Sequence, residues 1–263
     1  MPVQLSTSRT LIAHLAEAGR PLAGMWVCSA SPIAAEICAG SGLDYVLIDA
    51  EHSPNDLSTL LPQLHACAAY PATTIVRVPY NDERLIKQFL DLGVVNLLVP
   101  MVHTAEQARA AVARVTYPPE GVRGVGSALA RASRWNRVPN YLARARETIS
   151  LILQIESGQA CENVDEIAAV EGVDALFVGP ADLAGDLGLL GQAEDEAVVE
   201  RVLACIEAGH RAGKPVGTNA FNPEMARRYF EAGADFVLVG ADVTLLARAS
   251  EKLADDYLPT LGG

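Results

Sequence analysis

Short apolar runs alternate with amphipathic segments along the chain, and this alternation predicts a fold of repeated strand–helix units. The apolar runs are rich in Val, Ile and Leu, which is typical of strands buried on both faces of a parallel sheet. The segments between them space their apolar residues as helices packed on a sheet do. We expect eight strands, near residues 24–28, 45–48, 73–78, 96–100, 149–156, 175–178, 215–219 and 236–240.

A recurring phrase marks the start of three of these strands. Gly42, Gly172 and Gly233 each precede an aspartate that leads into an apolar run, and a glycine at this place is typical of a helix end. Eight such units without a shift in composition predict an α/β fold, a single (β/α)8 TIM barrel with one domain over residues 1–263. An open doubly wound sheet is the alternative, but it usually has fewer strands, and no GxGxxG follows the first strand.

Composition and charge indicate which kinds of partner and which cellular compartment to expect. The 263 residues carry a net charge of −12 without a basic stripe, which argues against nucleic acid. No apolar run approaches the roughly 18 residues of a membrane span, and the N-terminal pattern does not suit a signal peptide. The five cysteines are scattered without a CxxC pair, so we expect reduced thiols in a cytoplasmic protein.

The strand near residues 45–48 ends in a burst of ionisable side chains. Asp49, Glu51 and His52 follow the apolar run where the strand leaves the core. This carboxyl end of a parallel strand is where α/β folds place their chemistry. His52 is a candidate general base that Asp49 would orient, with a structural histidine as the alternative. The alternative for Asp49 and Glu51 is that they cap or solvate a loop.

Other strands end in the same way, and strand ends meet at one face of a barrel. Gln154 and Glu156 end the fifth strand, and Asp182 follows the sixth. Hard divalent cations such as Mg²⁺ or Mn²⁺ take oxygen ligands, often a couple of carboxylates completed by water and substrate. We therefore predict a metal site at Glu156 and Asp182, although either carboxylate alone also suits a capping role.

A positive charge and a set of backbone donors accompany these carboxylates. Arg77 ends the third strand among apolar neighbours, where a guanidinium is costly without an anion. It forms either a salt bridge with Asp49 or Glu51, or it stabilises negative charge on a substrate oxygen. The segment Gly179-Pro180-Ala181-Asp182 is either an ordinary turn or a helix start whose free N–H groups bind a carboxylate.

The lysines exclude one kind of chemistry. Lys87 and Lys252 fall within predicted helices, and Lys214 precedes a strand, so none ends a strand. A Schiff-base enzyme needs a desolvated lysine in the cavity. Any carbonyl chemistry here should therefore use a metal as the Lewis acid.

Residues 117–140 break the strand–helix rhythm. They hold several prolines and glycines together with Arg123, Arg131, Arg134 and Arg137. A segment of this length in a compact α/β domain is usually functional.

These motifs together resemble the HpcH/HpaI aldolase family of class II, metal-dependent pyruvate aldolases, over nearly the whole chain. The most specific segments are Leu47-Ile48-Asp49-Ala50-Glu51-His52, Leu98-Val99-Pro100-Met101-Val102, the stretch from Gly121 to Asn136, Gln154-Ile155-Glu156 and Gly179-Pro180-Ala181-Asp182.

The resemblance implies a role for each of the site residues. Glu156 and Asp182 would ligate Mg²⁺, Mn²⁺ or Co²⁺, and Gln154 would lie beside the metal's water ligands. Pyruvate would chelate the metal, with its carboxylate at the N–H groups around Ala181 and Asp182. Arg77 would hold the keto oxygen.

The resemblance also implies that His52, paired with Asp49, moves protons. It further implies a homo-hexamer, a dimer of trimers that exchange their eighth helices, in which residues 117–140 help to close a neighbour's site.

The implied reaction is the reversible cleavage of a 4-hydroxy-2-oxo acid to pyruvate and an aldehyde, such as succinic semialdehyde from 4-hydroxy-2-oxoheptanedioate. Asn219 departs from the leucine expected at the seventh strand, where an asparagine would hydrogen-bond a hydroxylated aldehyde. An aldolase for 2-keto-3-deoxy sugar acids, or a hydroxypyruvate/pyruvate aldolase, is therefore an alternative substrate class. A thioester lyase related to the citrate lyase β-subunit and a non-catalytic keto-acid-binding protein are the alternatives in function.

Overall fold

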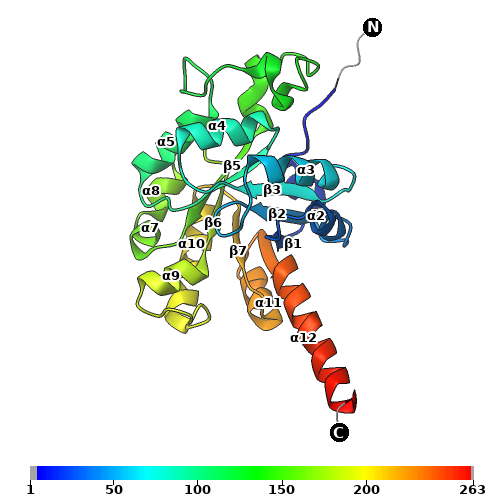
Figure 1. The fold of residues 1–263 in the computed structure, drawn as a ribbon. Helices are drawn as coiled ribbons and strands as arrows, with labels where there is room; N and C mark the ends of the chain where they lie inside the picture. The colour runs from blue at the N-terminus through cyan, green and yellow to red at the C-terminus, as the bar shows by residue number, and fades with distance from the viewer. Residues whose placement is uncertain (1–4, 262–263) are drawn as a thin grey trace.

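The computed structural model describes residues 5–261 and contains a closed barrel of eight parallel strands that pair in sequence order. Helices surround the barrel (Figure 1). The predicted (β/α)8 fold class is thus confirmed. The strands are β1 (Leu22–Val27), β2 (Tyr45–Asp49), β3 (Thr73–Arg77), β4 (Asn96–Val99), β5 (Ser150–Ile155), β6 (Ala175–Val178), β7 (Val216–Asn219) and β8 (Phe236–Ala241).

The helices follow the predicted rhythm, with short additions that the apolar pattern does not delimit. The α-helices are α1 (Leu11–Ala18), α2 (Pro32–Ala39), α3 (Leu57–Cys67), α4 (Glu83–Asp91), α5 (Ala105–Val115), α6 (Tyr141–Arg144), α7 (Gly158–Glu162), α8 (Val164–Ala168), α9 (Pro180–Asp186), α10 (Glu196–Arg211), α11 (Pro223–Glu231) and α12 (Asp242–Leu261). The 3₁₀ helices are η1 (Ser127–Leu129), η2 (Arg131–Ser133) and η3 (Ala145–Thr148). Helices as short as α7 and α8 show no readable period, because one turn holds too few apolar positions.

Residues 117–140 are ordered by a buried arginine and two short 3₁₀ helices. Arg123 is 1% exposed, forms an ion pair with Asp91 at 3.0 Å, and lies 4.5 Å from the centre of the Tyr117 ring. These contacts hold the segment against α4.

Aromatic rings fill the inside of the barrel, and two glycines leave the space that these rings occupy. Gly24 is paired with Tyr45, and Gly217 is paired with Phe236. A Cβ atom would lie 2.6 Å from the Tyr45 ring at the first position and 2.3 Å from the Phe236 ring at the second. The Phe236 ring lies 6.1 Å from that of Phe177, so the rings form a continuous packed column.

Helix α1 covers the amino-terminal ends of the strands. The N–H of Leu11 donates to Asn96 Oδ1 at 2.5 Å, and the N–H of Ile12 donates to Ser150 Oγ at 3.4 Å. Leu11 itself is fully buried. The barrel is therefore sealed at this end, and the carboxyl ends of the strands are left to form a site.

Helix α12 starts on the barrel and then projects away from it (Figure 1). The Asp242 carboxylate accepts hydrogen bonds from the N–H groups of Cys28 at 2.8 Å and Ser29 at 3.1 Å, which fixes the start of the helix. Leu246 is 70% exposed and Leu253 59% exposed farther along it. No helix within residues 5–261 combines the length and apolarity needed to cross a membrane.

We expect Gly217→Ala to lower the free energy of unfolding by about 1–3 kcal/mol, since the added methyl group overlaps the Phe236 ring. Gly240→Ala is the matched control, because a Cβ at this β8 glycine meets no atom within 4 Å. Urea denaturation of both variants measures the difference. Equal losses would contradict the packing argument.

Candidate functional site

A buried ion pair joins the carboxyl ends of β2 and β3. Asp49 and Arg77 are direct partners in the sheet, and Arg77 Nε lies 2.8 Å from Asp49 Oδ1. Arg77 Nη1 lies 2.9 Å from Glu51 Oε2. The guanidinium sits 4.4 Å from the centre of the Trp26 ring, which stacks edge-on against Phe177 in the aromatic column. Arg77 therefore forms the predicted salt bridge, and it does so with both Asp49 and Glu51.

The turn after β2 is built around Asp49. Its carboxylate accepts the N–H groups of Glu51 at 3.0 Å and His52 at 3.3 Å, and its backbone carbonyl accepts from the Asn55 amide at 2.6 Å and the Ser53 hydroxyl. A buried carboxylate is tolerated when its lone pairs are used in this way. Asp49 thus fixes both Arg77 and the turn.

The predicted contact between Asp49 and the His52 imidazole takes a different form. Asp49 binds the backbone of His52, whereas the imidazole Nε2 lies 3.7 Å from Glu51 Oε2. The reason is competition, since Arg77 and two backbone N–H groups already use the Asp49 carboxylate. The His52 side chain is 61% exposed at the rim of the site.

Glu156, just beyond β5, is held by two donors inside the barrel mouth. It is 3% exposed, its Oε1 accepts the Met101 N–H at 2.6 Å, and its Oε2 accepts from Gln154 Nε2. Met101 adopts a left-handed conformation (φ 56°), which sets the direction of that N–H. Gly179 leaves room for the pair, because a Cβ there would lie 3.0 Å from Gln154 Nε2 and 3.1 Å from Glu156 Oε2.

The carboxylates at this face influence one another. The pKa of Glu156 is raised to about 7, mainly by burial; the Met101 N–H and Arg77 oppose the rise, and the charges of Glu51 and Asp182 add to it. Burial likewise raises the pKa of Glu51 to about 7, with Arg77 again opposing and Asp49 and Asp182 adding to the rise. Mutual repulsion among neighbouring carboxylates marks a place where a cation would be stabilised.

The donor set fits a hard divalent cation. Gln154 Oε1 is buried and has no hydrogen-bond partner within the described residues, so an acceptor oxygen is left over beside Glu156. Asp182 lies in the first turn of α9. Residues 5–261 hold no group of three or more His, Cys, Asp or Glu side chains placed to bind a metal by themselves. Two carboxylates would then leave several positions to water and substrate, as Mg²⁺ prefers.

Helix α9 begins as the sequence predicts, at Gly179 and Pro180, and Gly179 provides no side-chain cap for the N–H groups of Ala181 and Asp182. Asn219 ends β7 and is partly buried.

None of the three lysines lies at the carboxyl end of a strand. Lys87 is in α4, Lys252 is in α12, and Lys214, ahead of β7, donates to the Val173 carbonyl at 2.7 Å.

Three residues that contribute to the site were not predicted. The Trp26 ring packs against the Arg77 guanidinium, the Met101 N–H donates to Glu156, and the Asn55 amide donates to the Asp49 carbonyl. Trp26 lies near the end of a predicted strand, which was a usable signal. The Met101 contact depends on a backbone conformation that the residue type does not reveal.

Comparison with known proteins gives consistent matches along the chain. Residues 22–249 match the family HpcH/HpaI aldolase/citrate lyase. A hydroxypyruvate/pyruvate aldolase of Deinococcus radiodurans is 52% identical over 97% of this chain and 92% of its own. A 4-hydroxy-2-oxo-heptane-1,7-dioate aldolase of Shigella sonnei is 50% identical over 90% of this chain and 91% of its own. The crystal structure of a family protein from Burkholderia cenocepacia superposes with a TM-score of 0.89 at 38% identity, covering 94% of this chain and 98% of the other.

We expect Asp49→Ala to destabilise the protein by about 3–5 kcal/mol, because it removes one partner of a buried ion pair and leaves two N–H groups without an acceptor. Asp165→Ala, which breaks the exposed pair with Arg211, should cost about 0.5 kcal/mol or less. Chemical denaturation of both variants checks this. A small effect for Asp49→Ala would show that the pair does not hold the turn.

Proposed function

Because the chain belongs to the HpcH/HpaI aldolase/citrate lyase family, we propose that it is a metal-dependent aldolase that cleaves 4-hydroxy-2-oxo acids to pyruvate and an aldehyde. The observation that carries this proposal is the buried Glu156 carboxylate, placed beside the unpartnered Gln154 oxygen and within the field of two further carboxylates. A divalent cation would offset this concentration of carboxylates.

Glu156 and Asp182 would hold Mg²⁺, Mn²⁺ or Co²⁺, and Gln154 Oε1 would accept a hydrogen bond from a water beside them. A bound divalent cation supplies Lewis-acid polarisation of the keto acid. The uncapped N–H groups of Ala181 and Asp182 would bind the substrate carboxylate.

Arg77 would stabilise the negative charge that develops on the keto oxygen when the carbon–carbon bond breaks. Its Nε and Nη1 contact Asp49 and Glu51, while Nη2 makes no hydrogen bond within the described residues and stays available to substrate. A guanidinium fixed in advance needs little reorganisation during the reaction.

Proton transfer would fall to His52 and the adjoining Glu51. Cleavage removes the proton of the C4 hydroxyl and later returns a proton to the methylene carbon of the enolate, which becomes pyruvate. The imidazole lies at the rim, where it can exchange protons with water, and Glu51 beside it would stabilise its charged form.

Asn219 supports a second substrate class. Its amide offers a donor and an acceptor at the end of β7, which suits an aldehyde bearing hydroxyl groups, such as the product of a 2-keto-3-deoxy sugar acid. The relatives are themselves named for two different substrates, hydroxypyruvate/pyruvate and 4-hydroxy-2-oxo-heptane-1,7-dioate.

We also propose a homo-hexamer, a dimer of trimers in which α12 packs on a neighbouring subunit. The exposed Leu245, Leu246 and Leu253 on a helix that leaves its own barrel support this arrangement, because apolar side chains in such numbers are normally covered. Residues 117–140 would then help to close a neighbour's site.

A cytoplasmic location is proposed as well, supported by the free state of all five cysteines.

The first experiment is exchange of the pyruvate methyl protons in D₂O, followed by NMR with Mn²⁺ or Mg²⁺ and again with EDTA. We expect exchange only with metal. Glu156→Gln should slow it by about a hundredfold or more, since losing even an outer partner of a metal ligand typically costs 10–100-fold. The exposed Glu166→Gln on α8 is the control.

Full exchange in Glu156→Gln would remove the ligand assignment. Exchange that survives complete metal removal would contradict the metal-dependent mechanism. No exchange from folded, metal-loaded protein would favour a thioester lyase or a binding protein.

Asn219→Leu should shift the aldehyde preference. We expect kcat/KM for a hydroxylated aldehyde to fall about tenfold relative to succinic semialdehyde, because a hydrogen bond to the hydroxyl is lost. Pyruvate exchange, which needs no aldehyde, should stay unchanged in the same variant. An unchanged ratio between the two aldehydes would exclude Asn219 from aldehyde selection.

A further inference from the structure

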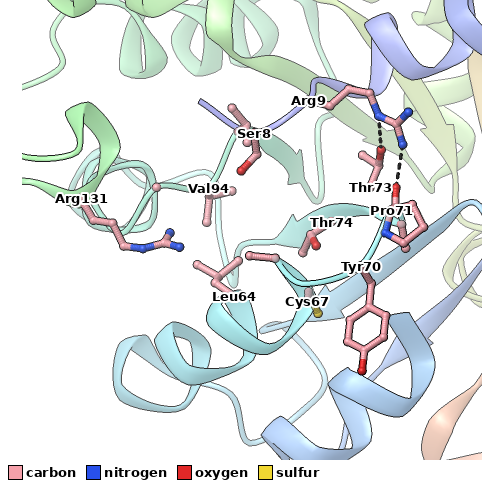
Figure 2. A pocket seen from close by; sticks show the side chains of 14 residues that line it. Ser8, Arg9, Leu64, Cys67, Tyr70, Pro71, Thr73, Thr74, Val94 and Arg131 are labelled. Atoms are coloured by element: carbon pink, nitrogen blue, oxygen red, sulfur yellow. Dashed lines mark hydrogen bonds between the residues drawn. The ribbon is translucent and has the colours of Figure 1, made fainter. Parts of the chain in front are cut away.

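A cavity lies at the opposite end of β3 from Arg77. It has a volume of about 220 Å³ and is bounded by the end of α3, the start of β3, the turn before β4, and the loop residue Arg131. The segment with Ser8 and Arg9 crosses above it (Figure 2). The cavity is thus formed by parts of the chain far apart in sequence, and it is separated from the strand ends that hold Glu156 and Asp182 by the length of the barrel.

Arg131 reaches into this cavity without an acidic partner. Figure 2 shows its side chain extending toward Leu64 and Val94, with Arg9 on the far side. Arg131 Nη1 donates to the Leu92 carbonyl at 2.8 Å, while Nε and Nη2 make no hydrogen bond or ion pair within the described residues. Gly93 permits this approach, because a Cβ there would lie 2.7 Å from Nη1.

The two charged side chains that line the cavity, Arg9 and Arg131, are both cationic. Burial, followed by the charge of the neighbouring Arg134, lowers the pKa of Arg131 to about 10. The pKa of His65 is lowered by burial and then by the same two arginines. Glu17 pairs with Arg9 at 3.1 Å and Asp91 pairs with Arg123, so Arg131 is the lining charge that no acid compensates within the described residues. An anion bound in the cavity would supply the counter-charge that the half-buried Arg131 guanidinium lacks.

We propose that this cavity binds a small oxyanion, a carboxylate or a phosphate, through the guanidinium of Arg131 and the hydroxyls of Ser8 and Thr74. The volume is below the range of about 300–1,000 Å³ typical of drug-sized ligands, so a small acid fits and a nucleotide does not. Arg131 offers its two free nitrogens as a fork for two oxygens of the anion. Leu64 and Val94 provide an apolar side for a short carbon chain.

The site is tested by calorimetric titration of the whole protein, without metal, using inorganic phosphate and succinate as separate probes. Arg131→Gln should weaken binding of the preferred probe by about tenfold or more, since hydrogen bonds to a charged group are lost. Thr74→Val, which keeps the size of the side chain and removes its hydroxyl, should weaken it less. Preference for succinate or for phosphate identifies which kind of oxyanion the site takes.

Two control variants separate this site from the others. Arg77→Gln, measured at a temperature at which circular dichroism shows it to be folded, should retain binding, because Arg77 lies at the other end of β3. This outcome does not depend on the proposed aldolase activity. Arg211→Gln on α10 removes an exposed arginine that does not line the cavity, and it should also retain binding. The proposal is overturned if neither probe binds with a Kd of about 1 mM or tighter. It is equally overturned if Arg131→Gln binds like the unmodified protein, or if Arg77→Gln alone abolishes binding.

Discussion

The buried pair of Arg77 and Asp49 is the constraint on which the site depends. Buried ion pairs contribute little to stability compared with apolar residues of the same size, because desolvation opposes the Coulomb attraction. Their presence here is better explained by position. In-register pairing places the two residues side by side at the ends of β2 and β3. The Asp49 carboxylate also accepts the N–H groups of Glu51 and His52, which holds the turn after β2. Removing the pair would release Arg77 and that turn together.

The pair in turn rests on the packing below it. Arg77 lies on Trp26, Trp26 packs edge-on against Phe177, and Phe177 contacts Phe236. The last ring fits only because position 217 has no side chain. A guanidinium stacked on a rigid column has few alternative positions, so substrate binding would not have to order it. The strand glycines that face the barrel interior therefore help to fix the position of Arg77 through the packing of rings, although they do not contact it.

The sequence carried the architecture but not the side-chain directions. Strand positions followed from apolar runs, and strand ends followed from the polar residues after them, because a closed parallel barrel leaves few choices. The spacing of Asp49 and His52 could not reveal that the backbone of His52, rather than its ring, would take the carboxylate. The left-handed Met101 and the approach of Arg131 to Gly93 depend on local backbone geometry and on contacts distant in sequence. Such features arise only once the chain is folded.

The two ends of β3 have opposite electrostatic character, and this bears on how an acidic protein handles anionic ligands. At the carboxyl end, Asp49, Glu51 and Glu156 outnumber Arg77, so a bound cation would offset their repulsion of an anionic substrate. At the amino end, Arg131 stands without an acid, and an anion needs no cation there. The proposed metal-dependent site and the proposed metal-independent site would therefore lie at opposite ends of the same strand. Chelation would empty the first and leave the second intact, which makes metal dependence the property that distinguishes them.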